Sequence, residues 1–350
     1  MADNRYRMLN SNYWHIILIL MVLLDVSAVA AAATKDHNNN LTAPWFGAAP
    51  PKKEYPLHRR GWDACLRCGG AERLGAIVDV GDLRQLNEAG AEELLDAVRA
   101  HGIIVIKGQN LTRGEQVKLT GKLGEVIALP SSFEGKDPEP FHPAIQRITN
   151  FWADGTWKGP FRFGAYWHQD GQFWLRPKHN ILSILHAQAN PPEGGETGFA
   201  DLRAARATIS RPLLERAEKT YIEASVRDIA DFAKGSEEDL AGFPDAKHPI
   251  LDFHSLDGGP QLYVGSPHMK VGGLESPEAG RALLDMLLMH ATSPSYTYFH
   301  AWNVGDVIIW DNTQTLHHAM PYHNDGTVKR ELYRTQSRLS VPERQLEDEL

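Results

Sequence analysis

Residues 166–173 read YWHQDGQF, and this stretch organises the interpretation of the whole chain. It places the imidazole of His168 and the carboxylate of Asp170 two positions apart. On a β-strand, residues i and i+2 project to the same face, so both side chains can reach one metal ion. His317, far downstream, is the candidate for a third ligand. Two histidines and one carboxylate on one face, with coordination positions left open, form the arrangement of non-haem Fe(II) oxygenases.

The surrounding pattern is one of short strands with helices inserted between them. Apolar runs bounded by turns predict strands over 76–80, 103–106, 147–149, 180–187, 248–253, 261–264, 297–300, 307–310 and 331–337, with another through His168. Helical spacing predicts helices over 91–100, 112–123, 202–224 and 276–292, and the polar residues 225–247 are interpreted as a flap. We therefore expect a mainly β fold with inserted helices on a double-stranded β-helix (jelly-roll) core.

The N-terminus has the composition of a targeting segment. Arg5 and Arg7 precede an apolar run over 14–33 that ends in small residues, and Asp25 interrupts it. This pattern predicts a signal peptide or N-terminal anchor over 1–33, and so a secretory or extracellular protein; membrane anchoring without cleavage and organelle targeting are the alternatives. An irregular arm over 34–72, a catalytic domain over 73–342 and a tail over 343–350 complete the expected organisation.

Composition excludes some classes of protein. The chain has 350 residues, a net charge of −8 and a pI near 6.1, which argues against a nucleic-acid binder. Its two cysteines, Cys65 and Cys68, lack the second pair that a zinc site usually needs, so we interpret them as a local disulfide or two free thiols. A His-x-Asp triplet arises about once by chance in a chain of this kind, so it needs independent support.

That support comes from several ordered motifs. The chain resembles the TauD/TfdA family of Fe(II)- and 2-oxoglutarate-dependent dioxygenases from about residue 75 to 337. The motifs are HGIIVIKGQNLTRGEQVKLTGKLGEV (101–126), WHQDGQFW (167–174), ILHAQANPPEGGETGFADL (184–202), GDVIIWDNTQTLHHAM (305–320) and KRELYRTQ (329–336). Their order and separation are far more specific than the triplet alone.

The resemblance implies a role for each matching residue. His168, Asp170 and His317 match the catalytic iron ligands. Adjacent strand residues face opposite ways, so only one of His317 and His318 can reach the metal, and the motif spacing favours His317. The hydroxyl that contacts the distal carboxylate of 2-oxoglutarate corresponds to Thr197, and the arginine that binds this carboxylate corresponds to Arg330. Arg334 resembles a second arginine near the co-substrate or the substrate anion. The resemblance leaves open which of the two it contacts.

The expected activity is hydroxylation of a small organic substrate, with O2 consumed and succinate and CO2 released. An anionic substrate and a homo-oligomer are both compatible with the sequence, and membrane contact is expected only if residues 1–33 stay attached. Two alternatives remain at this point. One is a non-oxidative, metal-dependent, cupin-like enzyme, and the other is a catalytically silent, secreted jelly-roll binding protein.

Overall fold

The computed structural model describes residues 63–64, 74–128, 143–160, 164–175, 178–228, 245–254 and 259–339. The predictions for residues 1–33, for Cys65 and Cys68, for most of the arm and of the flap, and for the C-terminal tail lie outside these ranges. Within the described ranges, none of the helices combines the length and apolar character that a membrane crossing requires. The limits of the catalytic domain, 73–342, stay a prediction.

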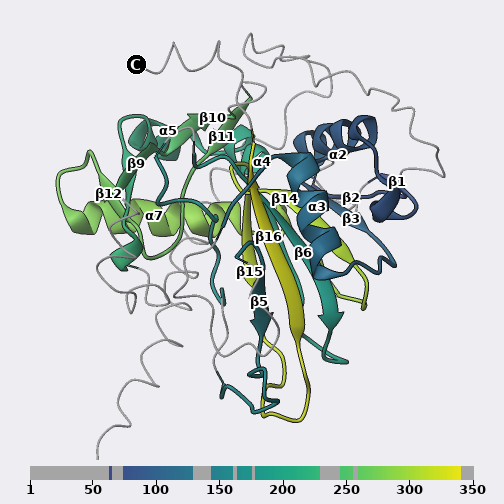
Figure 1. The fold of residues 1–350 in the computed structure, drawn as a ribbon. Coiled ribbons are helices and arrows are strands. Elements are labelled where there is room, and N and C mark those ends of the chain that lie inside the picture. The colour runs from purple at the N-terminus through teal and green to yellow at the C-terminus, as the bar shows by residue number, and fades with distance from the viewer. Residues whose placement is uncertain are drawn as a thin grey trace, which may run out of the picture. The chain divides into compact units, whose positions relative to one another are not determined.

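The largest sheet has eight strands and brings distant parts of the chain together. Its order is β1 (Asp63–Ala64), β2 (Ala76–Ile77), β3 (Ile103–Ile106), β14 (Val307–Asp311), β6 (Ile181–Ala189), β16 (Glu331–Arg338) and β4 (Glu125–Val126), and β5 (Gln146–Thr149) also pairs with β16. Figure 1 shows β14, β6 and β16 next to one another at the centre, with β3 and β2 toward the right. Because β14 and β16 both pair with β6, late segments of the sequence lie next to a central one.

A second sheet has three strands, in the order β13 (Thr297–His300), β7 (Thr197–Asp201) and β15 (Thr315–Ala319). Both neighbours of β7 run antiparallel to it. This sheet carries the His317 and Thr197 positions that the sequence singles out. The prediction of a mainly β protein with inserted helices is therefore confirmed.

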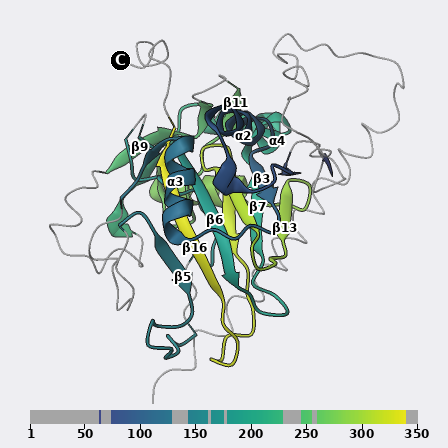
Figure 2. The same ribbon diagram turned by 45° about the vertical axis from the view of Figure 1, so that its right-hand side comes forward.

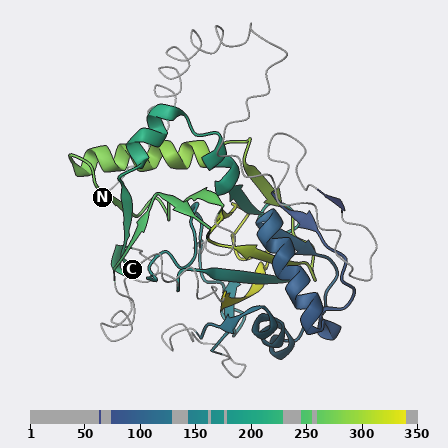
Figure 3. The same ribbon diagram turned by 90° about the horizontal axis from the view of Figure 1, so that it is seen from above.

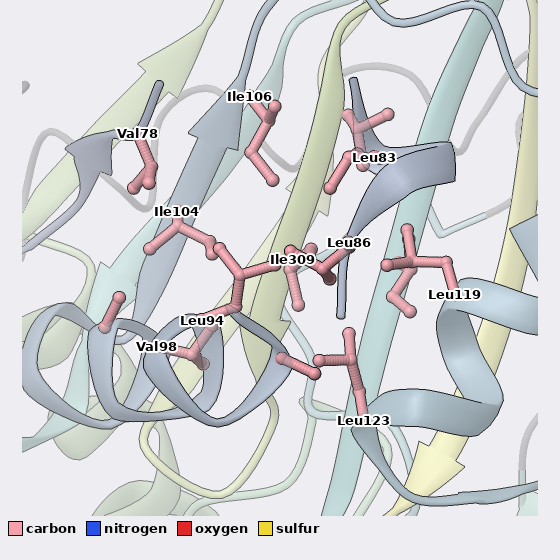
Figure 4. Close-up of a cluster of buried hydrophobic side chains, with 14 of the residues drawn as sticks. Val78, Leu83, Leu86, Leu94, Val98, Ile104, Ile106, Leu119, Leu123 and Ile309 are labelled. Carbon is pink, nitrogen blue, oxygen red and sulfur yellow. The ribbon is translucent and has the colours of Figure 1, made fainter. Parts of the chain in front are cut away.

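The central strands of the large sheet are buried on both faces, which explains their uninterrupted apolar runs. Alternate side chains project to opposite sides. Ile104 and Ile309 join the cluster under the helices in Figure 4, whereas Ile308 and Trp310 join a cluster that includes Phe199 of β7. One face of the sheet therefore packs against helices, and the other faces the functional residues.

Two helices cover the first of these faces. They are α2 (Glu88–His101) and α3 (Arg113–Leu123), which together with β3, β6 and β14 enclose the apolar cluster; Figure 2 shows α3 against β6 and β16. The spacing of Thr112 and Glu115 in the sequence predicts a capping box at the start of α3, and the structure contains it: the Thr112 hydroxyl accepts from the Glu115 amide, and the Glu115 carboxylate accepts from the Thr112 amide.

Most of the remaining elements lie on the other side of the strands. Helix α7 (Pro277–Ala291) begins after the cap residue Ser276, whose hydroxyl accepts from the Ala279 amide, and Figure 3 shows the strands between α7 and the pair α2 and α3. The other elements on this side are α4 (Leu202–Ala207), α5 (Arg211–Ala217), β8 (Tyr221–Ala224), η3 (Val226–Asp228), β9 (Ala246–Pro249), β10 (Leu251–Phe253), β11 (Pro260–Leu262) and β12 (Lys270–Gly272). The short η1 (Leu83–Gln85) lies instead with α2 and α3, where Leu83 joins their apolar cluster.

Two local predictions in this region need correction. The helical segment predicted over 202–224 contains two short helices and ends in strand β8, because Ile222 and Ala224 alternate inward while β8 pairs with both β9 and β12. Strand β9 also begins within the segment that was interpreted as a flap. The strands predicted over 248–253 and 261–264 correspond to β9 with β10 and to β11, and β10 and β11 pair antiparallel as a hairpin.

Candidate active site

The segment that carries His168 and Asp170 is not a regular strand, contrary to the prediction. His168 forms an isolated antiparallel bridge with His317 of β15, with N···O distances of 3.0 and 2.8 Å between the two backbones. Gly171 then turns the chain with a φ of +79°, and a Cβ at that position would lie 2.5 Å from Ile181. The single bridge brings the two histidines together, and the turn prevents the pairing from continuing.

Gln169 anchors this irregular segment from the side opposite the histidines. Its amide nitrogen donates to the Asn312 carbonyl at 2.8 Å, and its amide oxygen accepts from the backbone nitrogens of Val264 and Gly265 at 3.1 and 2.9 Å. The side chain is almost completely buried. It therefore replaces the backbone pairing that a regular strand would provide.

His168, Asp170 and His317 present one ligand atom each within 4.8 Å of one another. His168 Nε2 lies 3.8 Å from Asp170 Oδ1, and His317 Nε2 lies 3.7 Å from Asp170 Oδ2. His168 Nδ1 lies 2.8 Å from the Tyr166 carbonyl oxygen. Because a carbonyl only accepts, the N–H is on Nδ1, and the lone pair of Nε2 faces the cluster.

Electrostatics favour the protonation states that metal binding requires. Burial, followed by the neighbouring His168, holds the pKa of His317 well below its ordinary value, so this imidazole is neutral. Burial by itself would raise the pKa of Asp170, but the Arg334 guanidinium and the two imidazoles lower it to about 2. Neutral imidazoles with an ionised carboxylate are the donor set that a divalent transition metal binds.

The two oxygens of Asp170 have different surroundings. Oδ2 accepts from Arg334 Nη1 at 2.8 Å, Gln336 Nε2 at 2.9 Å and Ser183 Oγ at 3.1 Å. Oδ1 accepts no hydrogen bond from the described residues, and the Asp170 amide donates to Asn312 Oδ1 at 3.1 Å. The carboxylate is thus fixed through one oxygen, and the other is left to bind a metal.

His318 points away from this cluster, as strand alternation predicts. Its ring packs on Trp167, with 5.3 Å between ring centroids. His317 instead packs against the ring of His168, at 4.1 Å between centroids. The structure therefore places His317, and not His318, beside Asp170.

A pocket adjoins the cluster. Five of the site residues that the sequence predicts line it, and the remainder of its wall is largely apolar. Its walls are formed by Ile148, Gly164, His168, Leu185, Thr197, Trp310, His317, Ala319, Arg330, Leu332 and Arg334. The polar groups thus converge in an otherwise apolar space, which is the usual composition of a small-molecule site.

Arg330 is a buried cation in this pocket. Its Nε donates to the Gly195 carbonyl at 3.1 Å, and its backbone amide donates to Asn150 Oδ1 at 2.9 Å. No carboxylate among the described residues forms an ion pair with it, and burial lowers its pKa to about 10. An uncompensated buried charge is costly, so this guanidinium favours an anion bound beside it.

Arg334 lines the same pocket, but it has a carboxylate of the protein as its partner. It pairs with Asp170 at 2.8 Å, and both side chains are nearly buried. Arg330 and Arg334 share a face of the chain because the irregularity beside them lies on the partner strand: Glu331 pairs with Ala189 and the next residue pairs with Ala187. Both arginines therefore line the pocket, as their i, i+4 spacing on a strand predicts.

Sequence reasoning missed three residues that position Asp170: Ser183, Gln336 and Asn312. A signal existed for each one. Ser183 is the lone hydroxyl in the apolar run of β6, Gln336 lies two positions after Arg334 on the same face, and Asn312 follows an apolar strand directly. None of these signals identifies a partner without knowledge of how β6 pairs with β16.

The chain is similar in sequence to several characterised dioxygenases. It is 30% identical over 272 residues to the alpha-ketoglutarate-dependent 2,4-dichlorophenoxyacetate dioxygenase of Cupriavidus pinatubonensis, covering 72% of this chain and 90% of that protein. It is 28% identical to the (S)-phenoxypropionate/alpha-ketoglutarate-dioxygenase of Sphingobium herbicidovorans, with coverages of 73% and 88%. An alpha-ketoglutarate-dependent sulfate ester dioxygenase of Pseudomonas putida is 29% identical, with coverages of 78% and 89%.

Solved structures and a family model agree with these similarities. The crystal structure of AAD-2 in complex with Mn(II) and N-oxalylglycine is 25% identical, with a TM-score of 0.64 and coverages of 77% and 97%. A putative alpha-ketoglutarate-dependent taurine dioxygenase from Burkholderia xenovorans is 27% identical, with a TM-score of 0.62 and coverages of 77% and 88%. The family model matches residues 67–336. The chain therefore belongs to the taurine catabolism dioxygenase TauD, TfdA family.

Proposed function

We propose that this chain uses ferrous iron, 2-oxoglutarate and O2 to hydroxylate a small organic acid, on a double-stranded β-helix (jelly-roll) core. One observation carries the proposal: His168 and His317, the two histidines of the cluster that includes Asp170, line the same pocket as the buried cation of Arg330. The AAD-2 structure, which holds Mn(II) and N-oxalylglycine, supports the assignment of metal and co-substrate.

Different residues would bind the iron and the 2-oxoglutarate. His168 Nε2, His317 Nε2 and Asp170 Oδ1 would hold the iron. The bound iron and 2-oxoglutarate supply an oxidative decarboxylation that yields succinate and CO2 and activates O2. Arg330 pairs with the distal carboxylate of 2-oxoglutarate, and the Thr197 hydroxyl hydrogen-bonds to the same group.

The apolar walls of the pocket complete the site. Leu185, Leu332 and Trp310 flank the cluster and exclude water from the methylene groups of the co-substrate. Exclusion of water also strengthens the ion pair between a guanidinium and a carboxylate, because the local dielectric constant is low. Binding is therefore selective for a molecule with an apolar middle and an anionic end.

An acidic substrate is the class that the pocket and the relatives favour together. Arg334 adds a second guanidinium to the pocket. The names of two relatives specify aryloxy acids as substrates, 2,4-dichlorophenoxyacetate and phenoxypropionate, and a third specifies a sulfate ester. A substrate with an anionic group on an apolar body would suit the guanidiniums and the apolar walls of the pocket.

The test is a turnover screen with purified protein, Fe(II), 2-oxoglutarate and O2. Aryloxy acids, sulfonates and sulfate esters are the candidates, and succinate release must match product formation and require the candidate. Retained turnover in His168→Ala or Asp170→Ala would contradict the iron site. Full activity in Arg330→Ala would indicate a non-oxidative metal enzyme, and failure to bind iron after anaerobic reconstitution would indicate a silent binding protein.

We also propose, from the sequence of residues 1–33, that the chain enters the secretory pathway. Asn110 of the sequon Asn110–Thr112 is exposed, as a glycosylation site requires. Expression of the full chain with a C-terminal tag, followed by imaging and a glycosidase shift assay, tests this. A cytosolic signal and an unshifted band that Asn110→Gln does not alter would contradict it.

A further inference from the structure

The Thr197 hydroxyl is held from behind by the indole of Trp302. Trp302 Nε1 lies 3.0 Å from Thr197 Oγ1. An indole N–H can only donate, so the hydroxyl accepts this bond and its own proton points elsewhere. In the described part of the chain no acceptor for that proton lies within hydrogen-bond distance of Thr197 Oγ1, although the side chain is buried in the pocket wall.

The backbone of Thr197 leaves the hydroxyl little freedom to adjust. Thr197 is the first residue of the central strand of its sheet, paired with His300 of β13 on one side and with Ala319 of β15 on the other. Its Cα is therefore fixed from both sides. Only the side-chain torsions of Thr197 remain free to vary, and the hydrogen bond from Trp302 restricts them.

Trp302 is itself braced by a buried polar chain. Its indole meets the ring of His300 edge-on, with 4.8 Å between centroids and an interplanar angle of 82°. His300 Nε2 lies 3.0 Å from Asp306 Oδ2, and His300 Nδ1 lies 2.9 Å from the Tyr298 hydroxyl. Asp306 also accepts from Lys107 Nζ at 2.8 Å. Each of these groups has a partner, so the ring against Trp302 is rigidly placed.

The direction of each bond in this chain follows from the protonation states. Burial lowers the pKa of His300, which keeps the imidazole neutral. Burial and the nearby Asp306 raise the pKa of Tyr298 to about 12, so the phenol keeps its proton. Tyr298 then donates to Nδ1, and Nε2 donates to Asp306. The chain has one consistent arrangement of protons, and it does not compete for the indole N–H.

We propose that Trp302 is a positioning residue that orients the Thr197 hydroxyl as a donor toward the distal carboxylate of 2-oxoglutarate. This inference rests on the proposed function. With one acceptor site of the hydroxyl filled, its proton is pre-aligned for an incoming oxygen, beside the Arg330 guanidinium. Trp302 thereby helps the pocket to select 2-oxo acids that carry a distal carboxylate over those that lack it.

The experiment compares two ligands on Trp302→Phe. The phenyl ring can keep an aromatic contact with His300, but the substitution removes the N–H together with part of the indole volume. Thermal stability is therefore measured in parallel, and a change of no more than a few degrees is expected. Calorimetry under anaerobic conditions, on protein loaded with Mn(II), gives the Kd for 2-oxoglutarate and for 2-oxopentanoate, which has a methyl group in place of the distal carboxylate. Relative to the wild-type protein, we expect Trp302→Phe to raise the Kd for 2-oxoglutarate about 5-fold, from the loss of about one hydrogen bond. We expect it to raise the Kd for 2-oxopentanoate by less than about 2-fold.

Two further variants separate positioning from simple packing. In a Thr197→Val background, which lacks the hydroxyl, Trp302→Phe is expected to cause no additional loss of 2-oxoglutarate affinity. Trp152→Phe is the matched control, because that indole is 42% exposed and lies beneath Lys158. In turnover assays the KM for 2-oxoglutarate is expected to rise with kcat unchanged.

The outcomes are distinguishable. An equal loss of affinity for both 2-oxo acids, or the same loss in the Thr197→Val background, overturns the inference and leaves Trp302 as a packing residue. An unchanged Kd for 2-oxoglutarate in Trp302→Phe, with normal binding by the wild-type protein, overturns the inference alone. Failure of the wild-type protein to bind 2-oxoglutarate overturns the proposed function and this inference with it.

Discussion

Two guanidiniums line one pocket and have opposite surroundings. Arg334 is paired with Asp170 at 2.8 Å. Arg330 forms no ion pair with any carboxylate of the described chain; its Nε meets only the carbonyl of Gly195. Burial lowers the pKa of Arg330 to about 10, and the charge interactions with Tyr322 and Glu196 offset only part of this effect, as expected for a desolvated cation without an ion-pair partner.

This difference in surroundings gives the two arginines different roles, although in the sequence they are simply two arginines four positions apart. At the metal end, Arg334 is part of the fold: it neutralises and orients the Asp170 carboxylate before any ligand arrives. At the other position, Arg330 keeps its charge for an anion that the protein does not contain. Substitution of each group should therefore affect different quantities, and the following predictions use that contrast.

The largest effect on activity is expected from substitution of the metal ligand His317. His317→Ala removes an imidazole beside Asp170 and should abolish iron binding and detectable turnover. His318→Ala, one position further along β15, removes a ring that packs on Trp167 and should retain iron binding. Iron content after anaerobic reconstitution, measured with succinate release, compares the two. Equal losses in both variants would show that strand β15, and not the ligand, is what the substitutions disturb.

Arg330→Met is expected to weaken 2-oxoglutarate binding by about 100-fold, because charge-assisted bonds to a carboxylate are worth about 1.5–3 kcal/mol each. The same substitution should leave the free energy of unfolding of the ligand-free protein unchanged or raised, since it removes an uncompensated buried charge. Calorimetry and urea unfolding measure the two quantities. A strongly destabilised variant would mean that Arg330 has a structural counter-charge after all.

Arg334→Met should have the opposite profile in the metal-free protein. It leaves the Asp170 carboxylate buried without its cation, so unfolding should become easier by about 3 kcal/mol in urea titrations at neutral pH. Arg330→Met serves as the matched control, since it removes an equally buried guanidinium without breaking an ion pair. Equal stability of the two variants would contradict the division of tasks.

The pH dependence of stability follows from the same pair. In the folded, metal-free protein the pKa of Asp170 is about 2, below its ordinary value of 3.8. The unfolded chain therefore binds the proton more readily, and the stabilisation present above about pH 4 is lost as the pH falls toward 2. Arg334→Met raises the pKa of Asp170 in the folded protein and so narrows the difference from the unfolded chain, so the stability lost on acidification should become smaller. Urea unfolding at a series of pH values from 5 to 2 checks this reduction.

The sequence reveals residues whose chemistry is unusual for their position, and it fails where a contact depends on register between distant strands. His168, Asp170 and His317 could be grouped because their residue types and motif order are distinctive. The capping box of α3 could be predicted because it is local. Ser183 and Gln336 could not, because they meet only through the pairing of β6 with β16 across 153 positions.

The same limit explains the error at His168. Alternation of i and i+2 predicts a strand, but the segment makes one bridge and is then held by the side chain of Gln169, which no periodicity reveals. The contact between Trp302 and Thr197 is of this kind as well, since it depends on the register that sets Thr197 opposite His300. Contacts made by polar side chains in place of backbone pairing are the part of the site that the sequence could not predict.

Ser183→Ala is expected to have the smallest effect of these substitutions, and it tests directly how the Asp170 carboxylate is held in place. It removes one of three donors to Asp170 Oδ2 and leaves Arg334 and Gln336 in place. Supporting groups around a metal ligand are typically worth about 10- to 100-fold in metal affinity, and with two donors remaining we expect the lower figure. Because Asn312 Nδ2 also donates to Ser183 Oγ at 2.8 Å, Ser183→Thr, which keeps the hydroxyl, is the control. Competition for Mn(II) against a chelator measures the affinity; a loss as large as that of His317→Ala would show that Ser183 shapes the whole cluster and not one oxygen.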